Sequence, residues 1–285
     1  MLTARRLARL SLSMLIPLLA GSCTDVIAVQ QFAQASREVG IQFRPLAVDG
    51  LRSCHRAATY LLSGQAVSNC LFFESAEPTL LAVNNGLFSY ISSLGRLADL
   101  DAGKTAGSLQ NVGAELQQAD PKISADSLNK ANASIGLASA LVDVMASRYQ
   151  QKKMVAIIEH SNSAVQQVAG FLDVYAAFRY AQQIRDEQSR ELAFCTQWTD
   201  PAVPGVATEP IAVDLLKRRC TADFDSQAEK IAAIQKYQQA LRDVASAHQK
   251  LYEARNRWNT RQLVTDLAPA ISQISEAAQA MKKAF

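Results

Sequence analysis

Two long stretches without proline constrain the fold of this chain most strongly. No proline occurs between Pro121 and Pro201 or between Pro210 and Pro269. An interior proline costs a helix about 3 kcal/mol, so windows of this length are typical of long helices. The chain also has only 12 glycines in 285 residues. A turn-rich β architecture would need more of them, and we therefore predict an all-α protein.

Apolar residues in both windows recur with the spacing of a helical seam. The first window holds a seven-residue repeat that begins at Leu128, and the second predicts a helix over about 211–258. Its seam residues are Tyr237, Leu241, Val244, His248, Leu251 and Trp258. Spacing of this kind places side chains on one stripe, which predicts an elongated antiparallel helical bundle or coiled-coil hairpins. Because the polar His248 enters the stripe, we expect that this seam accepts a partner helix.

Glycine divides the chain into two regions. Eight of the 12 glycines lie between Gly40 and Gly113. Residues 23–119 are therefore predicted to be a smaller, disulfide-containing region of short helices and a linker, and residues 120–285 the long-helix bundle. The short helices are expected at about 24–39, 48–63, 66–75 and 78–100. In the bundle, we expect a helix break at 160–163 and a last helix over about 261–283.

Residues 1–22 have the three-part layout of an export signal. Arg5, Arg6 and Arg9 precede an apolar segment over 10–20, and the small residues Ala20, Gly21 and Ser22 lie at its end. As a helix this segment is about 16 Å long, too short for the roughly 30 Å hydrocarbon core. The three arginines belong to 29 Lys and Arg residues, and the remaining 26 balance 26 Asp and Glu. A mature chain without net charge is not expected to bind nucleic acid.

Small residues directly before a cysteine add a more specific signal. The segment Leu19–Cys23 resembles the lipobox of bacterial lipoproteins, with Ala20 where that motif usually has leucine. The resemblance implies that Cys23 carries acyl chains such as palmitate and becomes the mature N-terminus. Two or three chains hold a protein stably on a membrane. Because Thr24 rather than Asp follows the cysteine, the resemblance implies an outer-membrane protein, which we expect to face the periplasm. The alternative is an ordinary cleavage site beside a free or disulfide-bonded Cys23.

The other cysteines form an even set in an oxidising compartment. With Cys23 assigned to lipid, Cys54, Cys70, Cys195 and Cys220 remain. Of three possible connectivities we favour Cys54–Cys70 and Cys195–Cys220, because each pair is close in sequence. The alternatives are buried thiols or a metal site. The 15 and 24 intervening residues lack the close C-x-x-C pairs of zinc sites, so we expect no metal.

Two short motifs match catalytic signatures without their context. Residues 98–105 satisfy a loose P-loop pattern, but the segment before them has helical rather than strand periodicity. Ser127 and Lys130 match the S-x-x-K of penicillin-binding enzymes, but Lys104-Thr105 stands before the serine, where those enzymes have K-T-G after it. We interpret both as helix-end and surface residues.

Histidines and aromatic residues give the remaining candidates. His55, His160 and His248 lack the paired spacing of metal ligands, and for His248 we favour a partly buried, hydrogen-bonded position over a ligand or pH switch. A second group could line a ligand groove, although aromatic residues at helical spacing are more often core: Phe171, Tyr175, Phe178 and Tyr180.

These patterns predict a lipid-anchored, non-enzymatic helical scaffold or partner-binding module. It would meet the membrane through its N-terminal lipid and a protein partner, or a second copy of itself, through its helices, and would need no cofactor. The alternative is a small-ligand-binding or enzymatic bundle with a pocket near Phe171, Tyr175 and Phe178. A pore-forming hairpin is less favoured, since no later stretch approaches 18 apolar residues.

Overall fold

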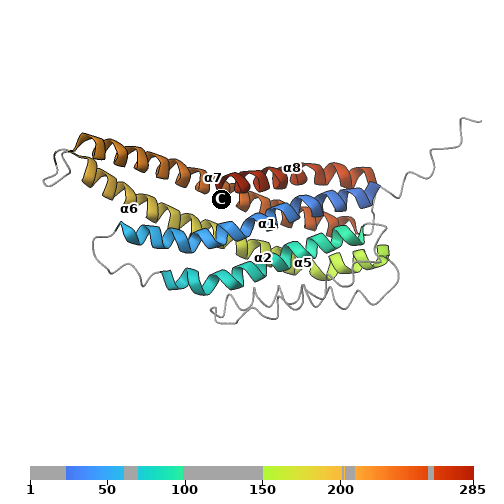
Figure 1. The fold of residues 1–285 in the computed structure, drawn as a ribbon. Coiled ribbons are helices and arrows are strands. Elements are labelled where there is room, and N and C mark those ends of the chain that lie inside the picture. The colour runs from blue at the N-terminus through green and yellow to red at the C-terminus, as the bar shows by residue number, and fades with distance from the viewer. Residues whose placement is uncertain (1–23, 61–69, 99–149, 201, 203–208, 256–259) are drawn as a thin grey trace, which may run out of the picture.

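The structure, a computed structural model, is an elongated bundle of helices that run roughly along one axis (Figure 1). It describes residues 24–60, 70–98, 150–200, 202, 209–255 and 260–285. The helices are α1 (Thr24–Thr59), α2 (Leu71–Leu97), α5 (Gln150–Tyr175), α6 (Ala181–Thr199), α7 (Pro210–Ala254) and α8 (Thr260–Ala284), with a π-helical turn (Ala176–Tyr180) between α5 and α6. Within these ranges no residue forms a β-strand, so the all-α prediction is confirmed.

The order of the helices gives the molecule two different ends. Helix α1 packs against both α2 and α8, and α7 packs along α8 and α5. Helices α6 and α7 form a hairpin that extends past the other helices at one end of the bundle (Figure 1). Helix α1 begins at the opposite end, directly after Cys23 in the sequence. With 45 residues, α7 is about 68 Å long, so the two ends are far apart.

A single hydrophobic core runs along the bundle, and its buried residues come from α1, α2, α5, the π turn, α6, α7 and α8. The largest of its fully buried side chains are aromatic: Tyr90, Tyr180, Tyr237, Phe32 and Phe43. Removing one such side chain from water stabilises a fold by about 1.5–3 kcal/mol. The ring of Phe43 in α1 stacks on that of Tyr237 in α7, with the centroids 5.3 Å apart. The N-terminal helices therefore share their core with the long-helix bundle.

The prediction of several short N-terminal helices is wrong. Helices α1 and α2 have 36 and 27 residues and continue through Pro45 and Pro78. Two glycines serve close packing between these helices instead of turns. A Cβ atom at Gly40 would lie 2.5 Å from the ring of Phe88, and one at Gly95 would lie 2.4 Å from Cβ of Ala33. The linker expected after these helices lies outside the described residues.

The predicted helix break at 160–163 is also wrong. Helix α5 passes through this segment without interruption, and the Ser161 hydroxyl donates to the carbonyl oxygen of Ile157 at 2.6 Å. The irregularity comes later, at the π turn. Because a π turn has i→i+5 hydrogen bonds, Tyr175 and Tyr180 come to the same side of the chain, and both are buried. Helices α7 and α8 lie where the sequence predicts them, and α8 continues through Pro269.

Both disulfides of the favoured pairing are present. Cys54 near the end of α1 bonds to Cys70 before α2, and Cys195 of α6 bonds to Cys220 of α7. The sequence separations are 16 and 25 residues. On the chain-entropy estimate, loops of this size contribute roughly 3 kcal/mol each. The second disulfide joins the two helices of the projecting hairpin.

Candidate functional site

A group of charged side chains lies inside the bundle where α1, α6 and α7 meet. Its members, called the charged cluster below, are Asp49, Arg56, Tyr180, Glu187 and Lys230. Arg56 donates to Glu187 at 2.5 Å and to Asp49 at 3.1 Å, and the ammonium group of Lys230 lies 3.0 Å from both oxygens of Asp49. The Tyr180 hydroxyl donates to Asp49 at 2.6 Å. The Asp49 carboxylate of α1 therefore contacts the π turn and α7 as well as its own helix.

The electrostatics of the charged cluster are balanced. Burial alone would raise the pKa of Asp49, but hydrogen bonds from Arg56 and Tyr180 and the charge of Lys230 lower it below its usual range. Burial and the adjacent Asp49 carboxylate raise the pKa of Tyr180, so this hydroxyl stays protonated. Two carboxylates face two cations. The cluster thus has no excess charge with which to attract a ligand.

A second polar group, called the neutral cluster below, comprises Tyr90, Ser161, Asn162 and His248. The Tyr90 hydroxyl lies 2.5 Å from the Ser161 hydroxyl and 2.7 Å from Nε2 of His248. Nδ1 of His248 lies 2.9 Å from the side-chain oxygen of Asn162. Since that oxygen only accepts, Nδ1 carries the hydrogen and Nε2 accepts from Tyr90. Burial lowers the pKa of His248 to about 4, so the imidazole is neutral.

The neutral cluster has residue types that occur in catalytic sites, but no access for a substrate. Tyr90 and His248 are completely buried, and Ser161 is 1% exposed. Ser161 contacts Tyr90 rather than the imidazole, so no base is positioned to take its proton. His248 is hydrogen-bonded, as the sequence suggested, but it is fully rather than partly buried.

A third buried group lies in the α6–α7 hairpin. The Glu191 carboxylate accepts a hydrogen bond from Gln227 at 2.6 Å, and burial raises the pKa of Glu191. No cation contacts this carboxylate among the hydrogen bonds and ion pairs of the described residues. It lies one helical turn from Cys195, inside the part of the hairpin that the disulfide holds together.

The seam predicted to receive a partner is filled by the chain itself. Its members Tyr237, Leu241, Val244, His248 and Leu251 are each 0% exposed. Their neighbours come from the other helices of the same bundle: Tyr237 stacks on Phe43, for example, and His248 contacts Tyr90. No face of this seam is left for a second helix. The last predicted member, Trp258, lies outside the described residues.

The aromatic group of α5 and the π turn does not surround a common space. Tyr175 and Tyr180 are buried in the core, Phe171 is half-buried and Phe178 is 73% exposed. Three hollows on the described surface are lined by other residues. His55 and His160 are exposed, and the latter contacts its own helix at the carbonyl of Ala156. Cys23, Lys104, Ser127 and Lys130 lie outside the described residues.

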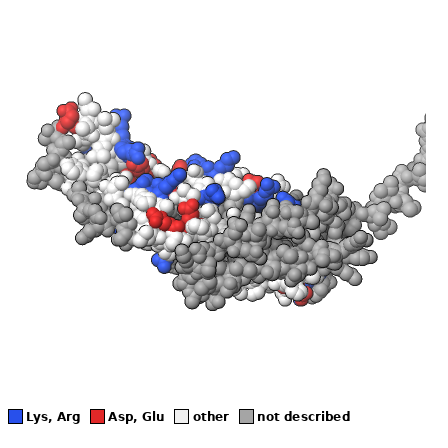
Figure 2. Space-filling model, turned by 60° about the horizontal axis from the view of Figure 1, so that its bottom comes forward, with Lys and Arg blue, Asp and Glu red and all other residues white. Residues whose placement is uncertain are grey.

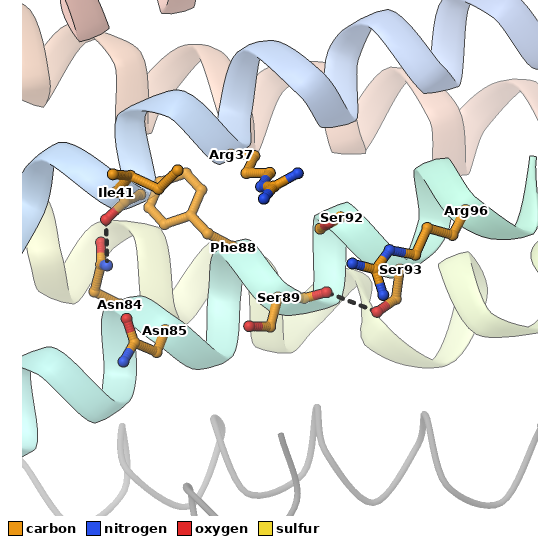
Figure 3. Close-up of a pocket in the computed structure, with 10 residues that line it drawn as sticks. Arg37, Ile41, Asn84, Asn85, Phe88, Ser89, Ser92, Ser93 and Arg96 are labelled. Atoms are coloured by element: carbon orange, nitrogen blue, oxygen red, sulfur yellow. Dashed lines mark hydrogen bonds between the residues drawn. The ribbon is translucent and has the colours of Figure 1, made fainter. Parts of the chain in front are cut away.

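One of the three hollows lies between α1 and α2 and has a volume of about 250 Å³ (Figure 3). Gly40 and Phe88 lie where the two helices approach closely. The polar residues that line the hollow are Arg37 from α1 and Asn84, Asn85, Ser89, Ser92, Ser93 and Arg96 from α2. Asn84 is itself engaged, since its amide donates to the carbonyl of Gly40 at 3.0 Å. Among the described residues, no aspartate or glutamate lines this hollow.

The molecule is thus an elongated, disulfide-stabilised helical bundle with internally paired polar clusters. It matches no protein-family model, no curated protein and no solved structure. None of the described helices is long and apolar enough to cross a membrane. In the same part of the chain, no three His, Cys, Asp or Glu side chains are grouped as metal ligands.

Sequence reasoning missed the charged cluster. The available signal was weak: Asp49 and Arg56 lie one heptad apart in α1, but Glu187 and Lys230 follow 131 and 181 residues after their partners. The hollow between α1 and α2 was missed as well, because the prediction of separate short helices left no long pair to form it.

Proposed function

We propose that this chain is a lipid-anchored protein of the bacterial envelope, held at the outer membrane through Cys23, and that it binds a protein partner without catalysis. The observation that carries the proposal is the position of exposed apolar side chains on the projecting hairpin. Leu192, Ile211 and Leu215 are 55–69% exposed on α6 and α7. Large exposed apolar side chains on a stabilised projection are typical of interaction surfaces.

The positions of the two ends of the bundle support an anchor at one end and a binding surface at the other. Helix α1 begins with the residue after Cys23, so a lipid on that cysteine would hold the near end of the bundle against the membrane without an intervening tether. The hairpin would then reach away from the bilayer (Figure 1). The Cys195–Cys220 disulfide keeps α6 and α7 together along this projection.

The buried polar clusters favour binding over catalysis. Their hydrogen-bonding and charged groups contact one another inside the bundle, and a catalytic group must reach a substrate. Surface charge gives no alternative interaction surface on the face shown in Figure 2, where basic and acidic side chains of the coloured region are interspersed.

The lipid anchor is tested by Cys23→Ala in the full-length precursor. We expect loss of acyl labelling and accumulation of the uncleaved precursor. Cys54→Ala serves as the control for loss of a cysteine, because it should leave acyl labelling intact. A Cys23→Ala protein that is still cleaved at the same point and still fractionates with the outer membrane would disprove the anchor.

The binding surface is tested by a photo-crosslinking amino acid placed at Leu215 or, as a matched control, at Phe178. Both side chains are exposed, at 62% and 73%, so neither replacement should disturb the core. We expect a discrete crosslinked protein in living cells from position 215 alone, and its loss when Ile211→Glu is added. Crosslinks from position 178 but not from 215 would favour the alternative site near the aromatic group.

A further inference from the structure

We propose that the hollow between α1 and α2 binds a small organic oxyanion, a phosphate ester or carboxylate with a polar body. The described lining of this hollow contains no acidic side chain, which distinguishes it from the other two. Those two each include a glutamate, Glu38 or Glu229, beside their lysines. Among the described residues, the ionisable side chains that line the α1–α2 hollow are two arginines, Arg37 and Arg96.

The two arginines approach the same part of the hollow from different helices. In Figure 3, Arg37 extends from α1 toward α2, and the side chain of Arg96 turns back along α2 beside Ser92 and Ser93. Within the described residues no carboxylate contacts Arg37, which is exposed at the rim. A guanidinium group presents its N–H donors in a planar fork that matches the oxygens of a phosphate or carboxylate.

The rest of the lining suits the polar body of such an anion. Asn85, Ser89 and Ser92 lie on one stripe of α2 at spacings of four and three residues, and all three line the hollow. Their amide and hydroxyl groups both donate and accept hydrogen bonds, as hydroxyl-bearing ligands require. The volume of about 250 Å³ exceeds what a bare inorganic anion would fill.

The close contact between α1 and α2 fixes the width of the hollow. Gly40 lets Phe88 pack directly on the backbone of α1, because a Cβ atom there would lie only 2.5 Å from the ring. The hydrogen bond from Asn84 to the Gly40 carbonyl holds the same point. The rigid crossing therefore keeps the side chains of the two helices at a constant separation, which favours a defined ligand over nonspecific ion binding.

The test measures binding of glycerol 3-phosphate to the full chain in neutral detergent micelles by calorimetry. We expect saturable binding that Arg37→Gln weakens about tenfold, as loss of a charge-assisted hydrogen bond would. The matched control is Arg44→Gln, since Arg44 is also an exposed arginine of α1 but does not line the hollow. It should change the affinity less than about twofold.

Two further comparisons identify the ligand. Asn85→Ala leaves the charge unchanged and should weaken glycerol 3-phosphate more than inorganic phosphate, which lacks the polar body. The second comparison adds phosphatidylglycerol to the micelles. Competition with glycerol 3-phosphate would indicate that the hollow binds a lipid headgroup. Failure to compete would indicate that it binds a soluble anion. Absence of saturable binding by both probes, or equal losses in Arg37→Gln and Arg44→Gln, would overturn the proposal.

Discussion

The charged cluster and the neutral cluster both lie inside the bundle, but they keep polar groups there by different means. In the charged cluster, Asp49 remains ionised because Arg56 and Lys230 surround it and Tyr180 donates to it. In the neutral cluster, the imidazole of His248 is uncharged, and Tyr90 donates a hydrogen bond to the ring nitrogen that lacks a hydrogen.

The difference predicts two kinds of vulnerability. A compensated ion pair is sensitive to the loss of one partner, because the other charge is left in a poorly solvated place. A neutral hydrogen-bonded group tolerates the loss of a partner better but is sensitive to acid, because protonation creates a buried charge with no counterion. The two vulnerabilities, loss of an ionic partner and protonation by acid, can be measured separately.

The largest effect is expected from Asp49→Asn. The substitution keeps the shape of the side chain but leaves the ammonium group of Lys230, only 14% exposed, without a carboxylate. Breaking a buried pair costs 3–5 kcal/mol, and we expect about 3 kcal/mol because the Arg56 side chain is 37% exposed. Urea unfolding measures the loss. Asp214→Asn, which removes an exposed pair with Arg218, should cost less than about 0.5 kcal/mol.

The second-largest effect is expected from acid, which should lower the stability of the fold through the neutral cluster before it affects the charged cluster. The pKa of His248 is about 4 in the folded chain against 6.5 in the unfolded chain, so the unfolded state binds the proton more readily. Stability is therefore complete above pH 6.5 and falls by up to about 3 kcal/mol as the pH drops toward 4. The pKa of Asp49 is lowered below 3.8, so the charged cluster loses its contribution only in stronger acid.

The pH dependence is checked by unfolding the protein at a series of pH values. His248→Gln should flatten the curve between pH 6.5 and 4, whatever its effect on stability at neutral pH. An unchanged slope in that variant would mean that other groups cause the loss, and the account of the neutral cluster would fail.

The smallest effect is expected from Ser161→Ala. The substitution removes the hydroxyl that lies beside Tyr90 and donates to the Ile157 carbonyl, but the hydrogen bond from Tyr90 to His248 remains. We expect a loss of about 1 kcal/mol, the usual net value of one hydrogen bond. Ser163→Ala, two residues away and exposed, should change stability by less than about 0.5 kcal/mol. A loss above 3 kcal/mol for Ser161→Ala would erase the contrast between the clusters.

The sequence predicted those parts of the molecule that depend on short-range pattern. The second proline-free window indicated α7, and the proximity of the cysteines indicated the disulfides, because both signals are local. The heptad position of His248 indicated burial. Its partner Tyr90 lies 158 residues away, and no periodicity within one helix predicts which side chain the next helix brings opposite.

The N-terminal helices show why a local signal can also mislead. The glycine-rich composition of 40–113 predicts turns between short helices, and Gly40 lies in one of the predicted gaps; in the structure Gly40 and Gly95 allow α1 and α2 to approach closely. A glycine has both uses because it lacks a Cβ atom, and only the neighbouring helix decides between them. The π turn was missed for a related reason: no residue type in it is typical of such a turn, and the burial of Tyr175 and Tyr180 beside it depends on the neighbouring helices.

The pairing of the cysteines has a consequence for how the chain matures. Each disulfide joins cysteines that are consecutive among the four. In the export route that we propose, the amino end would emerge first, and each cysteine would appear soon after its partner. An oxidase that links thiols in order of appearance would make both native bonds, and no shuffling by an isomerase would be needed. The first covalent closure would be complete before the later helices emerge, so biogenesis of this molecule is well suited to a strictly vectorial route.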